Sequence, residues 1–306
     1  MEKIEVTMPL YEIRLSVTGA CNQQCIYCGP FSDGRGNNGY GELSVGQIEE
    51  ILPLLRKNNL HVQLTGGEPT LRLDLLKIVS KLKEGGLADI GLTTNCSMID
   101  VDRAVKLVEA GIVDIHVHVP SFNSEIFQKT TGNLNKGVIE NFKQVGIYLA
   151  KTGCRIEFNT PVTCLNEETM DALCDFCFVN KINLKLIEEV NIKQRQIGVN
   201  KIVVNLEKWL SKNGVSLEPE KINKKYGYIY DFGEFSFRIA LATRGLAEYL
   251  AGNCDVILYD GRYWMGGSNE QFLFSPSCFS RPQVGTLRDL ENNFNNVKDF
   301  YENYKK

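Results

Sequence analysis

The sequence lacks the features that are typical of secreted, membrane and nucleic-acid-binding proteins. No stretch approaches the ~18 apolar residues that a membrane span requires. The first residues contain no apolar run of signal-peptide length. The net charge is −3, which gives no general basic signal for nucleic acid. We therefore expect a cytoplasmic protein that binds no membrane and has no general affinity for nucleic acid.

Cysteine, in contrast, is abundant. Ten cysteines occur in 306 residues, and in a cytosolic chain they favour metal or redox chemistry over disulfide bonds. With 43% hydrophobic and 23% charged residues, the composition is that of an ordinary globular protein. The length fits one large α/β domain, or one domain with a smaller appendage.

Short apolar runs rich in β-branched residues alternate with helical patterns along the chain. We expect strands at 12–17, 61–65, 90–94, 114–119, 155–162 and 183–188, and helices at 44–57, 73–84, 100–110, 135–151 and 166–180. This alternation is typical of successive βαβ units with a parallel sheet. Six units predict an α/β fold, a partial (β/α)6 TIM-like barrel at residues 1–192. We expect residues 193–306 to be a C-terminal extension that caps the open, substrate side, with a helix over 286–306.

Three cysteines close to the N-terminus carry the first strong signal. Cys21, Cys25 and Cys28 have the spacing C-x3-C-x2-C. Full ligation of a cubane iron–sulfur cluster needs four cysteines, so this trio would leave one iron open to bind and activate a small molecule. The alternatives are a structural zinc site or three unrelated buried thiols. Zinc usually requires a second pair of ligands, and no pair with convincing spacing follows.

The second signal is a glycine-rich turn after the strand at 61–65. Gly66 and Gly67 would let the backbone approach a ligand closely, Glu68 could pair with an ammonium group, and Pro69 completes the motif. An ordinary strand-to-helix turn would use the same residue types. In parallel α/β folds, binding sites lie at the carboxyl ends of the strands. The cysteine run, this turn, Thr94 with Asn95, and Ser121 with Asn123 all fall at such ends.

Taken together, these motifs resemble those of the radical S-adenosylmethionine (radical SAM) superfamily. The resemblance implies a [4Fe-4S] cluster on Cys21, Cys25 and Cys28, with SAM chelating the open iron and its methionine amino group at Gly66-Gly67-Glu68-Pro69. Reductive cleavage of SAM would yield a 5′-deoxyadenosyl radical that abstracts hydrogen from the substrate. The cofactor carries the difficult step and the protein positions it. A flavodoxin- or ferredoxin-type protein would supply the electron.

Other residues are assigned to the SAM site by the same resemblance. Tyr27 would stack near the adenine, unless it only packs the loop, and Thr94, Asn95, His118 and Asn159 would complete the site. His116 and His118 alternate on one face of their strand, so a hydrogen-bonded core pair is an equal alternative for them. Arg14 matches the family pattern but could make a structural ion pair.

Residues 12 to about 190 most resemble the GTP 3′,8-cyclase branch, the enzyme of molybdenum cofactor biosynthesis, and three departures limit that resemblance. Cys96 replaces a glycine, and His118 and Pro120 replace a serine and an aspartate. The cyclase binds a second cluster with C-x2-C-x13-C. Here Ala251 takes the place of the first cysteine and Met265 or a neighbour that of the third, which leaves Cys254 and Cys278.

We therefore expect a single-cluster radical SAM enzyme. A nucleotide-like small molecule is the first candidate for its substrate, and a peptide is the second. The alternatives are a GTP cyclase with an altered second cluster and a non-catalytic iron–sulfur sensor or scaffold. Lys185 and Glu188 could meet the substrate or be solvated rim charges. Further charges that favour an anionic substrate are Arg238, Arg244 and Arg262.

The remaining cysteines and glycines have simpler interpretations. Cys174 and Cys177 fall on one face of an expected helix, and buried free cysteine is common. Cys154 and Cys164 flank a strand and are expected in the core. The pair Gly266-Gly267, with Tyr263 and Trp264 before it, is interpreted as the turn of a structural hairpin, with a substrate-facing lid as the alternative.

Overall fold

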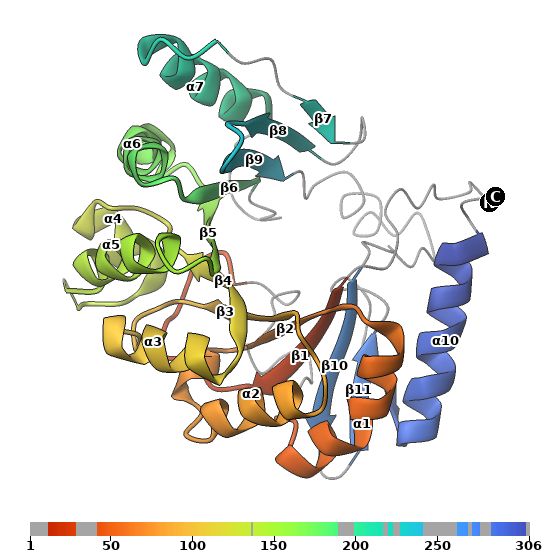
Figure 1. Cartoon of the computed structure of the whole chain (residues 1–306). Coiled ribbons are helices and arrows are strands. Elements are labelled where there is room, and N and C mark those ends of the chain that lie inside the picture. Colours follow the sequence, from red (N-terminus) through yellow and green to blue (C-terminus); the bar gives the residue numbers. More distant parts are fainter. Residues whose placement is uncertain are drawn as a thin grey trace.

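The computed structural model describes residues 12–28, 42–135, 137–188, 199–216, 220–222, 227–240, 262–268, 271–275 and 283–303. Their strands form one twelve-stranded sheet with the order β12-β11-β10-β1-β2-β3-β4-β5-β6-β9-β8-β7. Figure 1 shows the sheet as a curved wall, with helices along its outer side. Within these residues, no helix is long and apolar enough to cross a membrane.

The centre of the sheet is the predicted series of six parallel strands. These are β1 (Glu12–Thr18), β2 (His61–Gly66), β3 (Ile90–Thr94), β4 (Ile112–His118), β5 (Arg155–Val162) and β6 (Asn183–Glu188). The helices that connect them are α1 (Val45–Asn58), α2 (Leu75–Glu84), α3 (Val101–Ala110), α5 (Gly137–Ala150) and α6 (Met170–Asn180). The predicted α/β fold with a partial barrel is confirmed.

Local sequence explains where several of these helices begin. Ser44 and Gln47 form a capping box at the start of α1, and Asp100 accepts a hydrogen bond from the Arg103 amide at the start of α3. In two of the predicted helices a short 3-10 helix precedes the α-helix, so the predicted start was too early. The helix expected from residue 73 begins at Leu75, after the short 3-10 helix η1 (Pro69–Leu71), and the one expected from 166 begins at Met170, after η2 (Glu167–Thr169).

One helix before the fifth strand was not predicted. Helix α4 (Ser124–Thr131) is eight residues long, and the Asn123 side chain accepts hydrogen bonds from the Glu125 and Ile126 amides at its start. Gly132 ends it in the left-handed conformation with φ 68°. A helix this short leaves little periodicity in the sequence, so only its two end signals mark it.

The two faces of the sheet differ sharply in polarity. In β1, Ile13 and Leu15 are fully buried in the apolar core beneath the helices, whereas the alternate residues Glu12 and Arg14 form an ion pair on the other face. The same alternation continues through β2, β4, β5, β6 and β9, because successive side chains of a strand point to opposite faces. The concave face, which we call the lumen, is therefore lined with polar and charged side chains.

The chain after residue 193 extends the sheet at both of its edges. Helix α7 (Val199–Lys212) is followed by β7 (Glu220–Ile222), β8 (Gly227–Asp231) and β9 (Ser236–Ala240), and β9 pairs in parallel with β6. At the other edge, β10 (Arg262–Ser268) pairs in parallel with β1, and β11 (Gln271–Ser275) and β12 (Gln283–Gly285) follow. The division into a core and a cap stays a prediction.

Two expectations for this part of the chain can be compared with the structure. The predicted helix at 286–306 is confirmed as α10 (Leu287–Asn303). The interpretation of Gly266-Gly267 as a turn is wrong, because both glycines lie inside β10, although β10 does pair with the next strand, β11, in the antiparallel arrangement of a hairpin. A Cβ atom on Gly267 would lie 2.6 Å from the Glu42 carbonyl oxygen, so the close crossing of another segment explains that glycine.

Candidate functional site

The three cysteines lie on the loop that leaves β1, at the carboxyl edge of the sheet. Cys21, Cys25 and Cys28 are all half-buried. Two backbone hydrogen bonds hold this loop against the end of α4, from the Gln24 amide to the Thr131 carbonyl (2.7 Å) and from the Ile26 amide to the Thr130 carbonyl (2.9 Å). The unpredicted helix therefore supports the cysteine loop.

The chemistry of these donors fits an iron–sulfur cluster. Thiolates are the ligands that such clusters prefer, and three of them on one half-buried loop match the number the superfamily uses. In the part of the chain that the structure describes, no three His, Cys, Asp or Glu side chains are grouped to hold a single metal ion. The fit therefore depends on the number, spacing and exposure of the cysteines.

The glycine-rich turn packs directly against the start of the cysteine loop. The Gly67 amide donates to the Thr18 carbonyl (2.8 Å), and the Glu68 amide donates to the Ala20 carbonyl (2.7 Å). A Cβ atom would lie 2.2 Å from the Thr18 oxygen at Gly66, which has φ +135°, and 2.0 Å from the Ala20 oxygen at Gly67. Only glycine permits this approach, which explains both residues of the motif.

The Glu68 carboxylate joins the turn to the end of β3. It is fully buried. One oxygen, Oε1, accepts from the Thr70 amide (3.0 Å), the Thr70 hydroxyl (2.5 Å) and the Thr94 hydroxyl (2.7 Å), and Oε2 accepts from the Asn95 amide (2.6 Å). Burial raises the pKa of Glu68, while these hydrogen bonds act in the opposite direction. The contact of Glu68 with the SAM amino group stays a prediction.

Cys96 occupies a backbone position that favours glycine. Its φ is 55°, in the left-handed region, which explains why the cyclase pattern has glycine there. The side chain is completely buried, and its amide donates to the Thr94 hydroxyl (2.9 Å). This departure therefore changes the packing behind the site and adds no exposed thiol to it.

Tyr27 and His118 contact each other across the site. The Tyr27 hydroxyl hydrogen-bonds His118 Nε2, and their ring centroids are 5.0 Å apart. Desolvation lowers the pKa of His118 to about 4, so the ring is neutral at neutral pH and its tautomer decides which of the two atoms donates. This contact links the cysteine loop to β4. The predicted contacts of both residues with SAM remain untested.

Asn159 stands beside His118 as its register partner on β5. Its Oδ1 atom is buried and has no hydrogen-bond partner among the described residues. Buried polar atoms are normally satisfied, so this oxygen is available to a donor that the chain does not supply. The contact of Asn159 with SAM stays a prediction, and this buried oxygen supports it.

His116 belongs to a ladder of charged side chains in the lumen. Its Nε2 lies 3.3 Å from Asp114 Oδ2 and 3.9 Å from Glu157 Oε1, and Glu157 also pairs with Arg238. Desolvation lowers the pKa of His116, although Asp114 opposes the shift. His116 is therefore held by neighbouring carboxylates, as the core alternative expected, and His118 is not part of that pair.

The remaining predicted residues lie in different surroundings. Lys185 is half-buried on the lumen face, where its charge acts on His116, and it is the register partner of Arg238. Glu188 is only 5% exposed, so the interpretation of that residue as a solvated rim charge is wrong. Residues Arg244, Ala251, Cys254 and Cys278 lie outside the described residues, as does the side chain of Arg262.

The other cysteines are explained by packing, with one exception. Cys174 and Cys177 lie on the buried face of α6, and burial raises the pKa of both thiols. Cys154 is buried as predicted. Cys164 is exposed, so its assignment to the core is wrong. It lies two residues beyond the end of β5, where the chain has already left the sheet.

Three residues beside the site were not predicted. Thr70 binds Glu68 with both its amide and its hydroxyl, and Asn22 and Ser97 bind the side chain of Asn95. Asn22 lies inside the cysteine run and Ser97 two residues after Asn95, so position relative to the motifs was the available signal. Small polar residues have many roles in loops, so residue type alone does not single out these three.

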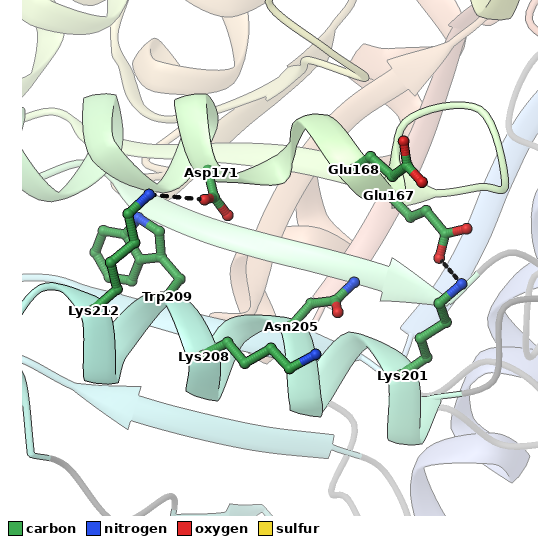
Figure 2. A pocket seen from close by; sticks show the side chains of 8 residues that line it. All are labelled: Glu167, Glu168, Asp171, Lys201, Asn205, Lys208, Trp209 and Lys212. Atoms are coloured by element: carbon green, nitrogen blue, oxygen red, sulfur yellow. Dashed lines mark hydrogen bonds and ion pairs between the residues drawn. The ribbon is translucent and has the colours of Figure 1, made fainter.

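A groove of about 400 Å³ lies elsewhere, between η2, α6 and α7 (Figure 2). Ion pairs between Lys201 and Glu167 and between Lys212 and Asp171 cross it, and Trp209 donates to Asp175 (2.8 Å). Its eight lining residues include none of the predicted site residues. Because exposed pairs of this kind contribute little, we treat this groove as the packing seam of two helices.

Comparison with known families identifies the class of protein. The sequence model of the radical SAM superfamily matches residues 15–177, more than half of the chain, including the cysteine loop and the glycine-rich turn. The chain belongs to the radical SAM superfamily. Membership indicates an enzyme and implies a [4Fe-4S] cluster and SAM as its cofactors.

Curated relatives place the chain more closely. It is 33% identical over 196 residues to a probable GTP 3′,8-cyclase of Sulfolobus acidocaldarius, which is 63% of this chain and 58% of that protein. It is 30% identical over 235 residues to a probable GTP 3′,8-cyclase of Methanococcus maripaludis, 73% of this chain and 74% of that protein. The chain thus spans little more than half of the first relative's length.

Solved structures share the fold. Streptococcus suis SuiB bound to its precursor peptide SuiA matches with a TM-score of 0.65 and 16% identity, over 93% of this chain and 64% of that one. The protein anSMEcpe with bound AdoMet matches with a TM-score of 0.59 and 15% identity, over 94% and 82%. At such identities the likeness establishes the fold alone.

The four donors around Glu68 predict that its amide variant is unstable. Both oxygens face a backbone N–H, which can only donate, so the NH2 group of Glu68→Gln opposes a donor in either orientation. We expect a loss of roughly 1–3 kcal/mol in the free energy of unfolding, measured with urea at pH 7. The control Glu125→Gln alters an exposed ion pair and should change little. Equal stability of the two variants would contradict the analysis.

The lowered pKa of His118 predicts a pH dependence of stability. Between pH 6.5 and about 4 the unfolded chain binds the proton that folded His118 does not, so the free energy of unfolding falls as the pH falls. From pH 7 to pH 5 this group should contribute a loss of about 2 kcal/mol. The His118→Gln variant should lack that part of the slope in urea unfolding. An identical pH dependence in both chains would show that the pKa of His118 is the same in the folded and the unfolded chain, which would contradict this prediction.

Proposed function

We propose that this chain is a radical SAM enzyme with a single cluster on Cys21, Cys25 and Cys28, which acts on a small anionic, nucleotide-like substrate in the lumen. We place it in the cytoplasm, with a flavodoxin- or ferredoxin-type protein as the electron donor. Superfamily membership supports the class of reaction. The substrate class is supported by the charges of the lumen.

The observation that carries the proposal is the packing of three loops into one site. The glycine-rich turn is hydrogen-bonded to the start of the cysteine loop through Gly67 and Glu68. The end of β3 is held to the same turn through Thr94 and Asn95. A purely structural turn would not need two glycines in contact with a loop of three half-buried thiols.

Each part of the site has a distinct task in this proposal. Cys21, Cys25 and Cys28 would hold the cluster, which, when bound, supplies the electron that cleaves the S–C5′ bond of SAM. Gly66 and Gly67 leave room beside the cysteine loop, because any side chain there would meet backbone atoms. The Tyr27–His118 contact fixes the aromatic ring between the last two cysteines, and Asn159 Oδ1 is available to accept a hydrogen bond from a ligand.

The lumen favours an anion on the side of β5, β6 and β9. Lys185 and Arg238 are register partners on the lumen face, and Glu157 is the carboxylate paired with Arg238. His116 and His118, whose pKa values are lowered, add no positive charge at neutral pH. Lys185, Arg238 and Glu157 together carry two positive charges and one negative charge, so these described side chains are net positive. Such a wall suits the phosphates of a nucleotide.

Burial of Met265 supports a site with one cluster. This residue stands near the place of the third second-cluster cysteine in the cyclase pattern. Here its side chain is fully buried in the apolar core. Since Met265 is the register partner of Leu15, it faces the helices and not the lumen. A cluster-ligating cysteine at that position would point away from a substrate in the lumen.

Other functions have narrower support. A peptide is the second candidate substrate, because SuiB, a protein with this fold, was solved with its precursor peptide bound. A GTP cyclase with an altered second cluster agrees with the names of the curated relatives. A non-catalytic sensor or scaffold would explain the replacements at Cys96, His118 and Pro120, but not the retention of the whole glycine-rich turn.

Cleavage of SAM tests the class of reaction. The anaerobically reconstituted chain, given SAM and dithionite, should form 5′-deoxyadenosine, and Cys25→Ala should reduce that yield at least about 100-fold because one cluster ligand is lost. Cys164→Ala, which removes an exposed thiol elsewhere, should leave it unchanged. A bound cluster without cleavage in the unaltered chain would favour the sensor or scaffold.

The net positive charge of this wall predicts which ligands promote the reaction. A nucleoside triphosphate deuterated in its ribose should raise the yield of 5′-deoxyadenosine and transfer deuterium to it. Lys185→Gln should weaken that response about tenfold or more, since a charge-assisted hydrogen bond is worth about 1.5–3 kcal/mol. Lys181→Gln, an exposed surface lysine, is the matched control. Transfer from a peptide and none from nucleotides would overturn the substrate class.

A further inference from the structure

A ring of three side chains lies beside the first cysteine. The Asn95 Nδ2 donates to Asn22 Oδ1 (2.9 Å), Asn22 Nδ2 donates to Ser97 Oγ (2.9 Å), and Ser97 Oγ donates to Asn95 Oδ1 (2.6 Å). Asn95 is 8% exposed, so its amide has little access to water. The ring closes the cysteine loop onto the segment that follows β3.

The orientation of the Asn95 amide is fixed by its partners. The Ser97 backbone amide lies 3.0 Å from Asn95 Oδ1, and a backbone N–H can only donate. The atom facing it must therefore be the oxygen, which settles the ambiguity that usually attends side-chain amides. The NH2 group of Asn95 then points toward the cysteine loop.

One hydrogen of that NH2 group is left for a sulfur atom. Asn22 Oδ1 takes the first hydrogen, and the Cys21 Sγ lies 3.9 Å from the same nitrogen. A thiolate accepts hydrogen bonds and carries no donor. Hydrogen bonds to the sulfurs of an iron–sulfur centre help to set its reduction potential, and groups that contact a ligand orient it.

We propose that Asn95 is a positioning residue for Cys21, and that its amide donates a hydrogen bond to the ligand sulfur and raises the reduction potential of the cluster. The inference rests on the proposed function, in which Cys21 holds the cluster. A donor beside a thiolate stabilises the reduced, more negative cluster more than the oxidised one, because the extra charge strengthens the hydrogen bond. Asn22 and Ser97 act by fixing the amide.

This role differs from the SAM contact that the sequence predicted for Asn95. Its side-chain oxygen is occupied by two donors of Ser97, and its two side-chain hydrogens are directed to Asn22 and Cys21. The backbone amide is bonded to Glu68 (2.6 Å). Every polar group of Asn95 except its carbonyl is thus directed within the protein.

The test is an EPR-monitored redox titration of the anaerobically reconstituted chain without SAM. Asn95→Ala should retain its iron and show a more negative midpoint potential, with an altered EPR line shape for the reduced cluster. The control Asn141→Ala removes an amide that binds the Ile99 and Cys96 carbonyls of the same segment, and neither of these bonds involves Cys21, Cys25 or Cys28. Its potential should equal that of the unaltered chain.

The outcomes separate this inference from the proposed function. If the unaltered chain binds no cluster, the proposed function fails and the inference fails with it. If the unaltered chain holds the cluster but Asn95→Ala has the same potential, or Asn141→Ala shifts it equally, only the inference fails. If Asn95→Ala loses its iron, Ser97→Ala decides, because it keeps the donor but removes the two hydrogen bonds of the ring that involve the Ser97 hydroxyl. A potential more negative than that of the unaltered chain in Ser97→Ala supports the role, and an unchanged potential overturns it.

Discussion

The geometry of the site depends on the carboxylate of Glu68. A fully buried charged group is costly unless hydrogen bonds replace its lost hydration. Here Thr70, Thr94 and Asn95 supply four donors. Because Thr70 belongs to the glycine-rich turn and the other two to the end of β3, satisfying this one group fixes two loops relative to each other. The backbone of the same turn then holds the cysteine loop.

The second constraint is the polarity of the two sheet faces. Helices cover the outer face, so its side chains are apolar, while the lumen carries Glu12, Arg14, Asp114, Glu157 and Arg238 in paired arrangements. Buried ion pairs of this kind contribute little net stability. Their presence in place of a packed apolar core agrees with a lumen that receives a polar ligand. Family membership and fold alone do not identify that ligand.

The fold could be predicted from the sequence where local pattern and tertiary structure agree. The strands β3, β5 and β6 have the predicted boundaries, because β-branched runs between turn residues mark them well. Helix α4 is too short for its period to be visible. Strands β9 and β10 pair with β6 and β1, far away in the sequence, and no local signal specifies such pairing.

The features of the site likewise divide into those that the sequence could identify and those that it could not. Spacing identified Cys21, Cys25 and Cys28 and the glycine-rich turn, since motifs with fixed offsets survive in a linear sequence. Three other features depend on loops that meet only in three dimensions. They are the hydrogen bonds from protein donors to Glu68, the Tyr27–His118 contact and the ring around Asn95. Nothing in the sequence distinguishes an asparagine that binds a ligand from one that binds its neighbours.

The count of iron and acid-labile sulfide per chain, on the anaerobically reconstituted full chain, tests the central claim most directly. A site with one [4Fe-4S] cluster predicts about four irons per chain, and at most a small residual fraction in the Cys21→Ala variant. About seven or eight irons would mean that a second cluster is bound, and no iron at all, or one zinc per chain, would contradict the account.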